Sequence, residues 1–212
     1  MEAQDLVYSE ASDSARIQQL LDQARRGFRS SAGGAEQDYW LARTHLLTAI
    51  HLNRLEKSRA AVRELDDVFD LADSALEAGE FSEGLRLKAD AHFQMSYARG
   101  FTYMIRHGGE SRDLAIRAYE LEPNNANAAI TASGFYLNAP GVAGGNVNTG
   151  IEILEELAER DDLHRSNDFL VHVWLASGYD KVGDAERARS HFRRAQRIYP
   201  QSRALADLGE RI

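Results

Sequence analysis

The fold of this chain is decided by residues 169–202, which read FLVHVWLASGYDKVGDAERARSHFRRAQRIYPQS. Two helical patterns of apolar residues flank the pair Gly183-Asp184, and Pro200 follows the second pattern. Glycine adopts the left-handed conformation that ends a helix, and aspartate caps the start of the next one. Proline cannot continue a helix. The stretch therefore predicts two helices joined by a tight turn.

Small and large side chains recur at set positions in this stretch. With Phe169 as position 1, the small residues Ala176, Gly183, Ala188 and Ala195 stand at positions 8, 15, 20 and 27, and the large residues Tyr179 and Phe192 at 11 and 24. Small residues let two helices cross closely, and large ones fill the space beside them. The pattern resembles the tetratricopeptide repeat (TPR), a 34-residue helix–turn–helix unit. The resemblance implies stacked helix pairs whose first helices line a concave binding face.

Two earlier units repeat parts of the pattern. In one of them, Pro123 ends the second helix, Gly100 lies within the first helix, and residues 108–109 form the loop between the two. Ser111 is the expected cap of a short second helix over residues 112–121.

The unit between these two has a long internal loop. Ser133 lies on its first helix and Gly150 on its second, and the loop over residues 138–148 is about five residues longer than in an ordinary repeat. Four further residues are inserted before Phe169.

The first ninety residues are less regular but still helical in pattern. Apolar residues at helical spacing predict helices over 14–28, 38–55 and 60–76, with a break at 33–34 and a turn at 78–81. No segment has the alternating pattern of a strand.

Together these patterns predict an all-α fold, an α-solenoid of about four TPR-like helix pairs in a single domain over residues 1–212. Irregular helical pairs occupy 1–90 and recognisable units 92–202. A polar capping helix is expected over 203–212, because repeat arrays need a soluble end.

Composition narrows the functional classes. The net charge of -8 and the lack of a strong basic surface argue against nucleic-acid binding, despite an arginine-rich helix around Arg193. The absence of cysteine excludes disulfides, thiolate metal sites and cysteine nucleophiles. No apolar run is long enough for a transmembrane segment. The N-terminal residues are acidic and polar, unlike a signal peptide, and equally fit the start of a mature chain whose leader has been removed.

The residues that could carry chemistry do not form a familiar pattern. The glycine-rich loop 140–146 follows a helix and has no lysine, so it does not predict a phosphate site. No two histidines have the spacing of a helical metal pair, and no nucleophile motif occurs. From the sequence we expect no enzyme activity, no cofactor and no metal.

The long loop carries a second resemblance, to a subgroup of bacterial TPR proteins. Its Gly-Gly-Asn at 144–146, followed by Gly-Ile-Glu-Ile-Leu-Glu at 150–155, is similar to a variant found in periplasmic TPR lipoproteins associated with tripartite ATP-independent (TRAP) transporters. The similarity covers roughly residues 100–200. It implies a setting in the bacterial periplasm or cell envelope, with the cytoplasm as the alternative. The chain has no lipid-attachment cysteine.

The TPR resemblance also implies a set of groove residues, which occupy the concave positions of each first helix. They are Leu41, His45, Tyr97, Phe101, Met104, Asn127, Ile130, Leu137, Leu170 and Val173. Tyr97, Phe101 and Met104 are expected on one face of one helix, opposite Ile130 and Leu137.

This groove is mostly apolar, which indicates that something covers it. One interpretation is that the N-terminal helices fill it as core. The others are a bound protein partner or hydrophobic ligand, and a neighbouring subunit. The sequence thus predicts a non-enzymatic scaffold that binds a protein partner or a small apolar ligand in its concave groove. The resemblance to TRAP-associated proteins implies a role accessory to a bacterial envelope transport system. The alternative is a structural homo-oligomer whose groove is its own subunit interface.

Overall fold

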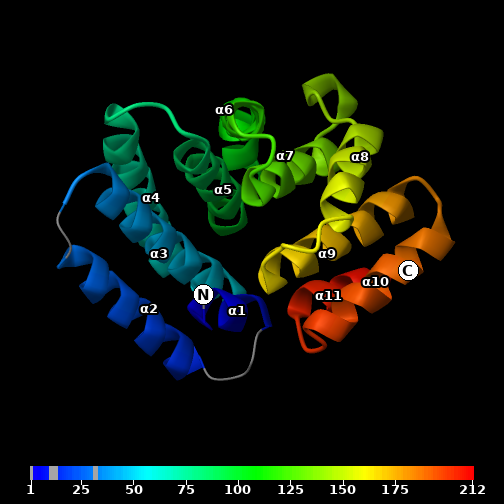
Figure 1. Cartoon of the computed structure of the whole chain (residues 1–212), viewed down its shortest axis with the longest axis horizontal. Helices are drawn as coiled ribbons and strands as arrows, with labels where there is room; N and C mark the ends of the chain where they lie inside the picture. Colours follow the sequence, from blue (N-terminus) through cyan, green and yellow to red (C-terminus); the bar gives the residue numbers. More distant parts are fainter. Residues whose placement is uncertain (1, 10–13, 31–32) are drawn as a thin grey trace. The chain divides into compact units, whose positions relative to one another are not determined.

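The computed structural model describes residues 2–9, 14–30 and 33–212. These residues form eleven α-helices and one short 3-10 helix, and none of them lies in a strand (Figure 1). The all-α prediction is confirmed. In chain order the helices are α1 Glu2–Ser9, α2 Ser14–Arg29, α3 Ala35–Arg54, α4 Ser58–Glu77, α5 Ser82–Arg99, α6 Phe101–Leu121, α7 Ala126–Asn138, η1 Gly141–Ala143, α8 Val147–Ala158, α9 Arg165–Lys181, α10 Ala185–Ile198 and α11 Arg203–Gly209.

The helices group into two compact units. One is Asp13–Glu122, which contains α2 to α6, and the other combines Met1–Ser12 with Pro123–Ile212. Within each unit, consecutive helices pack against one another, as in a solenoid: α2 to α6 in the first, and α7 to α11 in the second. The prediction of one domain over residues 1–212 stays a prediction.

The unit of α2 to α6 is built around the long antiparallel pair α3 and α4. Along α4, Ala61, Leu65, Val68 and Ala72 form one stripe at helical spacing and are fully buried. Near the start of α3, the Trp40 ring stacks on the Phe28 ring of α2, with the ring centroids 5.6 Å apart. The helices predicted over 14–28, 38–55 and 60–76 are thus confirmed as α2, α3 and α4.

The break between α5 and α6 lies at Gly100 and not at 108–109. Gly100 has a φ of 81°, in the left-handed region that favours glycine, and its N–H donates to Ser96 O at 2.8 Å. Helix α6 runs unbroken through both glycines of 108–109. The expected first helix through Gly100 is therefore wrong. Glycine inside a helix costs only about 1 kcal/mol relative to alanine, which packing against α5 can offset.

The position of this break also contradicts two other predictions. Ser111 lies in the middle of α6, where its hydroxyl donates to Ala89 O of α5 at 3.2 Å, so it does not cap a helix. Tyr97 lies on α5, whereas Phe101 and Met104 lie on α6. The expectation that these three side chains share one helix face is wrong.

The α9–α10 pair matches the sequence prediction closely. Gly183 has a φ of 80° in the turn, and the Asp184 carboxylate accepts a hydrogen bond from Arg187 N at 3.0 Å as the cap of α10. Ala176 and Ala188 have no exposed surface. Helix α10 ends at Ile198, two residues before Pro200.

The long loop between α7 and α8 is also present. It contains η1, and the Asn146 side chain caps α8 by accepting from Thr149 N at 3.3 Å. Gly145 has no room for a side chain, because a Cβ atom there would lie 1.8 Å from Ala139 O. The loop therefore folds back onto the end of α7.

Helices α1 and α11 complete the second unit. Helix α1 packs on α9, where the Gln4 amide donates to Ser166 Oγ at 2.8 Å. Helix α11 buries Leu205 and Leu208 in a core that also contains Phe169 and Tyr199. The expected terminal helix exists, but its inner face is apolar, so it is amphipathic and not polar throughout.

Among the described residues, no helix combines the length and apolar character needed to cross a bilayer.

The close approach of α9 and α10 can be tested by placing a larger side chain at their contact. Ala195 has no exposed surface, so Ala195→Leu should lower the free energy of unfolding by about 1–3 kcal/mol through forced separation of the helices. Arg194→Leu is the control, because the Arg194 side chain is 51% exposed, and it should change stability by less than about 1 kcal/mol. Urea unfolding of both variants measures the difference. Equal stability of the two variants would contradict the packing described here.

Candidate functional site

Large exposed apolar side chains gather where α5 meets α6. The exposed fractions are 38% for Phe93, 66% for Tyr97, 71% for Phe101, 47% for Met104 and 69% for Ile105. These five residues are called the corner surface. The other large apolar residues that are exposed in the described part of the chain are Leu55, Leu121, Val142 and Val182, which are scattered along the sequence.

Helical spacing aligns the members of the corner surface on each helix. Phe93 and Tyr97 are one turn apart on α5, and their rings meet edge to face with centroids 5.2 Å apart. On α6, Met104 and Ile105 follow Phe101 by three and four residues, which places them on its side of the helix. The surface thus comprises two short apolar rows, one on each side of the bend at Gly100.

Other parts of the same helices are buried. Met95 of α5 is 2% exposed, and Ala115 and Ala118 of α6 are 2% and 0% exposed. Helix α5 therefore has its core contacts on one side and exposes apolar residues on another. On α6 the exposed Phe101 and Met104 begin a stripe that becomes buried further along the helix, at Ala115 and Ala118. The exposed row is not required to close the core of this unit.

The ten groove residues predicted from the sequence do not share one environment. Tyr97, Phe101 and Met104 are exposed, and Asn127 and Leu170 are partly buried. The remaining five are buried, and their exposed fractions are 8% for Leu41, 4% for His45, 6% for Ile130, 2% for Leu137 and 8% for Val173. Side chains buried to this degree have almost no surface to offer a ligand.

The buried members have identifiable roles in packing. Leu137 lies against Gly150 and Gly178, where a Cβ atom added to either glycine would come within about 3 Å of it. Val173 belongs to the core cluster around Phe169. For these residues the groove prediction is corrected. Their side chains face inward, but neighbouring helices of the same unit pack over them and leave no open groove.

Two members of the corner surface were missed by the sequence prediction. Phe93 and Ile105 fell outside the groove positions that the repeat pattern assigns to this segment, and for Ile105 the assumed continuation of the helix through Gly100 contributed. The signal that could have found them is local. A glycine directly before an aromatic residue can end one helix and start another, which changes the face to which every later residue belongs.

His45 is held in a polar network on the inner side of α3. Its Nδ1 atom lies 2.7 Å from Glu64 Oε2 and 3.4 Å from Asp67 Oδ2, and the Arg25 guanidinium lies 2.8 Å from the same Glu64 oxygen. Burial by itself raises the pKa of Glu64, but the hydrogen bond from His45 and the charge of Arg25 lower it below its ordinary value. Glu64 is thus an ionised acceptor shared by two donors.

Two groups of side chains have the composition of a metal site in the described residues. One is His45, Glu64 and Asp67, and the other is His92, His107 and Glu110. In the first group, the Arg25 guanidinium already pairs with Glu64. In the second group, burial lowers the pKa of His92 despite the opposing charge of Glu110, so the ring is neutral near pH 7 and able to act as a ligand.

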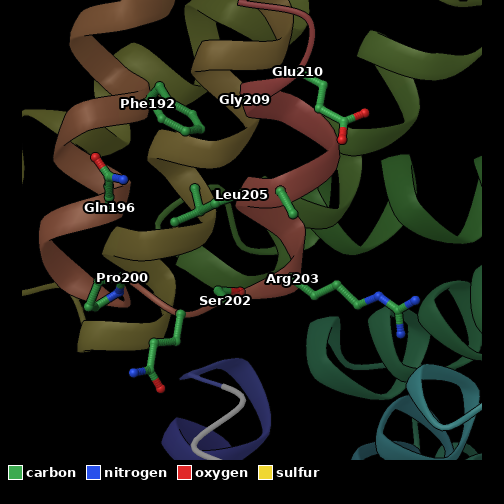
Figure 2. A pocket seen from close by; sticks show the side chains of 10 residues that line it. Phe192, Gln196, Pro200, Ser202, Arg203, Leu205, Gly209 and Glu210 are labelled. Atoms are coloured by element: carbon green, nitrogen blue, oxygen red, sulfur yellow. The ribbon is translucent and has the colours of Figure 1, made fainter.

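A shallow depression lies between α10 and α11, with a volume of about 610 Å³. Figure 2 shows Phe192 and Gln196 of α10 on one side and Leu205 and Glu210 on the other. A smaller hollow of about 310 Å³ adjoins it around Phe192 and Ile212. The larger hollow has polar lining residues, among them Gln201 and Arg203, but it is open to solvent and does not enclose a ligand.

A second histidine network ties α9 to α10. His172 Nδ1 lies 2.9 Å from His191 Nδ1, and the rings of His191 and Tyr179 stack with centroids 5.6 Å apart. The Tyr179 hydroxyl donates to Glu155 of α8 at 2.8 Å. Burial lowers the pKa of His172 to about 3, and the charge of Arg194 adds to this effect. His172 is therefore a neutral core residue.

Comparison of the chain with models of protein families, and with curated proteins, finds no match.

The neutral state of His172 predicts how stability depends on pH. The unfolded chain protonates this residue near pH 6.5, whereas the folded chain does so only near pH 3. Between these values the unfolded state binds more protons, so acidification should lower the free energy of unfolding by up to about 1.4 kcal/mol per pH unit. In His172→Asn this contribution is absent, and the pH dependence should be flatter. Urea unfolding through this pH range measures both slopes, and parallel slopes would contradict the assignment.

Proposed function

We propose that this protein is a non-enzymatic helical-repeat scaffold that binds a partner through the corner surface. The observation that carries the proposal is the exposure of Phe93, Tyr97, Phe101, Met104 and Ile105 around one helix bend. Contiguous apolar surfaces on soluble domains mark binding sites, whereas single exposed apolar residues are ordinary. Binding, and not catalysis, is the function that such a surface supports.

The composition of the surface favours a protein partner. Aromatic residues and methionine are enriched in the centres of protein interfaces, because they bury a large area and adapt to irregular shapes. Burial of apolar area contributes about 25 cal/mol per Å², so removing these side chains from water would supply much of the binding free energy.

The charges beside the surface indicate the chemistry of the partner. Arg99 and Arg106 are exposed on the same two helices, close in sequence to Tyr97 and Ile105. An interface of ordinary composition has an apolar centre and a polar rim. An amphipathic helix with an apolar face and acidic flanking residues fits this arrangement, and a small hydrophobic ligand would use only its centre.

The sequence resemblance to periplasmic TPR lipoproteins of TRAP transporters suggests where such a partner is found. We therefore propose a partner in a bacterial envelope transport system, with a cytoplasmic partner as the alternative. The resemblance rests on the loop between α7 and α8, which belongs to the other compact unit.

Self-association is the second function that the same exposure favours. Two copies of the corner surface would cover one another if the protein formed a homo-oligomer. The mass of the protein in solution, measured by analytical ultracentrifugation, distinguishes these proposals. A monomer supports capture of a different partner, and an oligomer that dissociates when Phe101 is changed to aspartate supports self-association.

Phe101→Asp tests the corner surface directly. Because Phe101 is 71% exposed, the new carboxylate stays hydrated, and the melting temperature should remain close to that of the wild type. Binding of an environment-sensitive apolar dye by the native protein should fall strongly, because a charge now lies in the centre of the surface.

The matched control is Val142→Asp, since Val142 is fully exposed but lies outside the corner surface. This variant should bind the dye like the wild type. Unchanged dye binding by Phe101→Asp would overturn the proposed site. A fall in its melting temperature of more than about 10 °C would show that Phe101 belongs to the core, because 1 kcal/mol shifts a protein of this size by only about 2–4 °C.

A further inference from the structure

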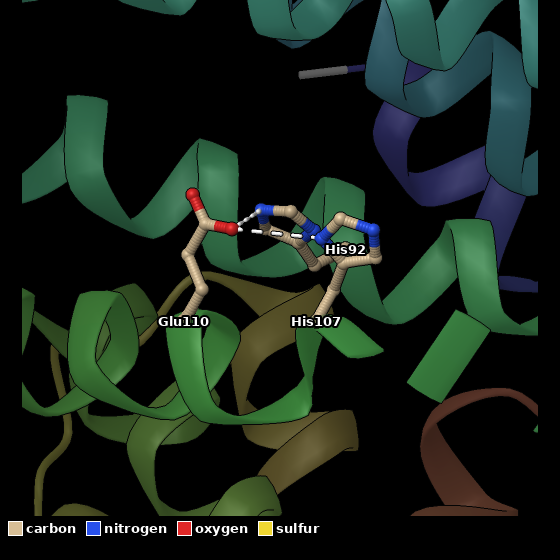
Figure 3. A group of neighbouring side chains, drawn as sticks. All are labelled: His92, His107 and Glu110. Atoms are coloured by element: carbon tan, nitrogen blue, oxygen red, sulfur yellow. Dashed lines mark ion pairs between the residues drawn. The ribbon is translucent and has the colours of Figure 1, made fainter. Parts of the chain in front are cut away.

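His92, His107 and Glu110 meet on the contact between α5 and α6. His92 comes from α5, and the other two come from α6, three residues apart (Figure 3). Both His92 Nε2 and His107 Nδ1 lie 3.6 Å from the same carboxylate oxygen, Glu110 Oε2. One ligand atom from each of the three residues lies within 4.8 Å of the other two.

His92 is held as a metal-binding histidine would be. Its Nδ1 atom lies 2.9 Å from the Tyr103 hydroxyl, and the Phe69 ring packs 4.6 Å from its own ring. Its Nε2 atom is buried and has no hydrogen-bond partner. Buried polar atoms without a partner are rare in folded proteins. In metal sites one ring nitrogen is oriented by a hydrogen bond while the other binds the ion.

Two of the three separations between the ligand atoms are close to those of a tetrahedral site. Zinc bonds of about 2.0–2.1 Å at tetrahedral angles separate neighbouring ligand atoms by about 3.3 Å. The two separations of 3.6 Å exceed this value by only a few tenths of an ångström. The His92 and His107 rings stack with an interplanar angle of 20°, so the His107 ring must turn for both nitrogens to face one ion. Glu110 is 54% exposed and His107 is 32% exposed, which leaves both side chains free to rotate.

The turn of α6 between the two ligands carries no other side chain. Residues 108 and 109, between the two ligands of α6, are both glycine. A Cβ atom added to Gly109 would meet nothing within 4 Å, and one added to Gly108 would meet only the Met104 side chain, at 3.9 Å. The two glycines therefore keep this turn of α6 free of side chains.

We propose that His92, His107 and Glu110 form a binding site for a zinc ion, with water as the fourth ligand. Two imidazole nitrogens and one carboxylate suit zinc and similar transition-metal ions, whereas magnesium and calcium take oxygen ligands. Tyr103 is a positioning residue, which acts by orienting His92.

Bound zinc would join the two helices of the corner surface. His92 lies eight residues before Gly100, and His107 lies seven residues after it. An ion at this point would link α5 to α6 on the buried side of the bend while leaving the exposed side unchanged. This proposal does not depend on partner binding by the corner surface.

The group of His45, Glu64 and Asp67 supplies an internal control. It has a similar set of ligand types, but the Arg25 guanidinium lies 2.8 Å from Glu64, where it competes with a cation. A single zinc ion should therefore bind preferentially at the site on α5 and α6.

The test is titration of the metal-free full-length protein with zinc chloride, in competition with a chromophoric chelator. The wild type should bind one zinc ion tightly. Glu110→Gln and His107→Gln each remove a ligand from a solvent-accessible position, so they should keep the fold, as judged by circular dichroism, and weaken zinc binding at least about tenfold. Asp67→Asn, in the control group, should bind zinc like the wild type.

Tyr103→Phe separates positioning from simple packing. It keeps the ring that stacks on His107 with centroids 4.3 Å apart, but removes the hydroxyl that faces His92. Loss of an orienting group of this kind weakens metal binding by about 10–100-fold. If Tyr103→Phe binds zinc like the wild type, its assignment as a positioning residue is wrong.

Two results would overturn the zinc site itself. One is zinc binding by the wild type that is no tighter than that of Glu110→Gln and His107→Gln. The other is a loss of binding in Asp67→Asn with none in Glu110→Gln, which would place the ion in the group around His45. Cobalt in place of zinc gives an independent readout, because tetrahedral coordination produces visible absorption bands that Glu110→Gln should weaken.

Discussion

The left-handed conformation of Gly100 is the constraint from which the candidate sites follow. With a φ of 81°, this residue ends α5 and lets α6 start immediately afterwards. A side chain with a Cβ atom rarely adopts this conformation, so the bend depends on glycine. Because α6 then packs back along α5, His107 and Glu110 reach His92, and Phe101 and Ile105 are left exposed.

The two faces of this helix pair support different kinds of chemistry. The inner face holds two histidines, a tyrosine hydroxyl and a carboxylate within reach of one another. The outer face holds aromatic and aliphatic side chains, which gain free energy by leaving water. A zinc ion that joined α5 to α6 would hold the two helices rigid. A partner that bound the corner surface would then cause a smaller loss of conformational entropy. The two proposals are thus compatible, although each is tested separately.

Buried histidines recur in both compact units, but in different roles. His172 is kept neutral by burial, and its neighbour His191 lies among arginines and next to Tyr179. His45 instead lies beside a carboxylate that Arg25 also contacts. The residue type alone therefore says little about function. What distinguishes His92 is that its buried Nε2 atom and a ring nitrogen of His107 lie at the same distance, 3.6 Å, from one carboxylate oxygen.

The sequence by itself determined the helical class and the α9–α10 pair, because these depend on local signals such as Gly183, the Asp184 cap and small residues at helical spacing. Part of the candidate site was also predictable, since Tyr97, Phe101 and Met104 were expected at a binding surface and are exposed. Only the tertiary structure decided that the bend lies at Gly100, that Leu137 and Val173 are core, and that His92 meets Glu110. A glycine permits a break without requiring one, and the packing of α5 on α6 selects which of several glycines is used.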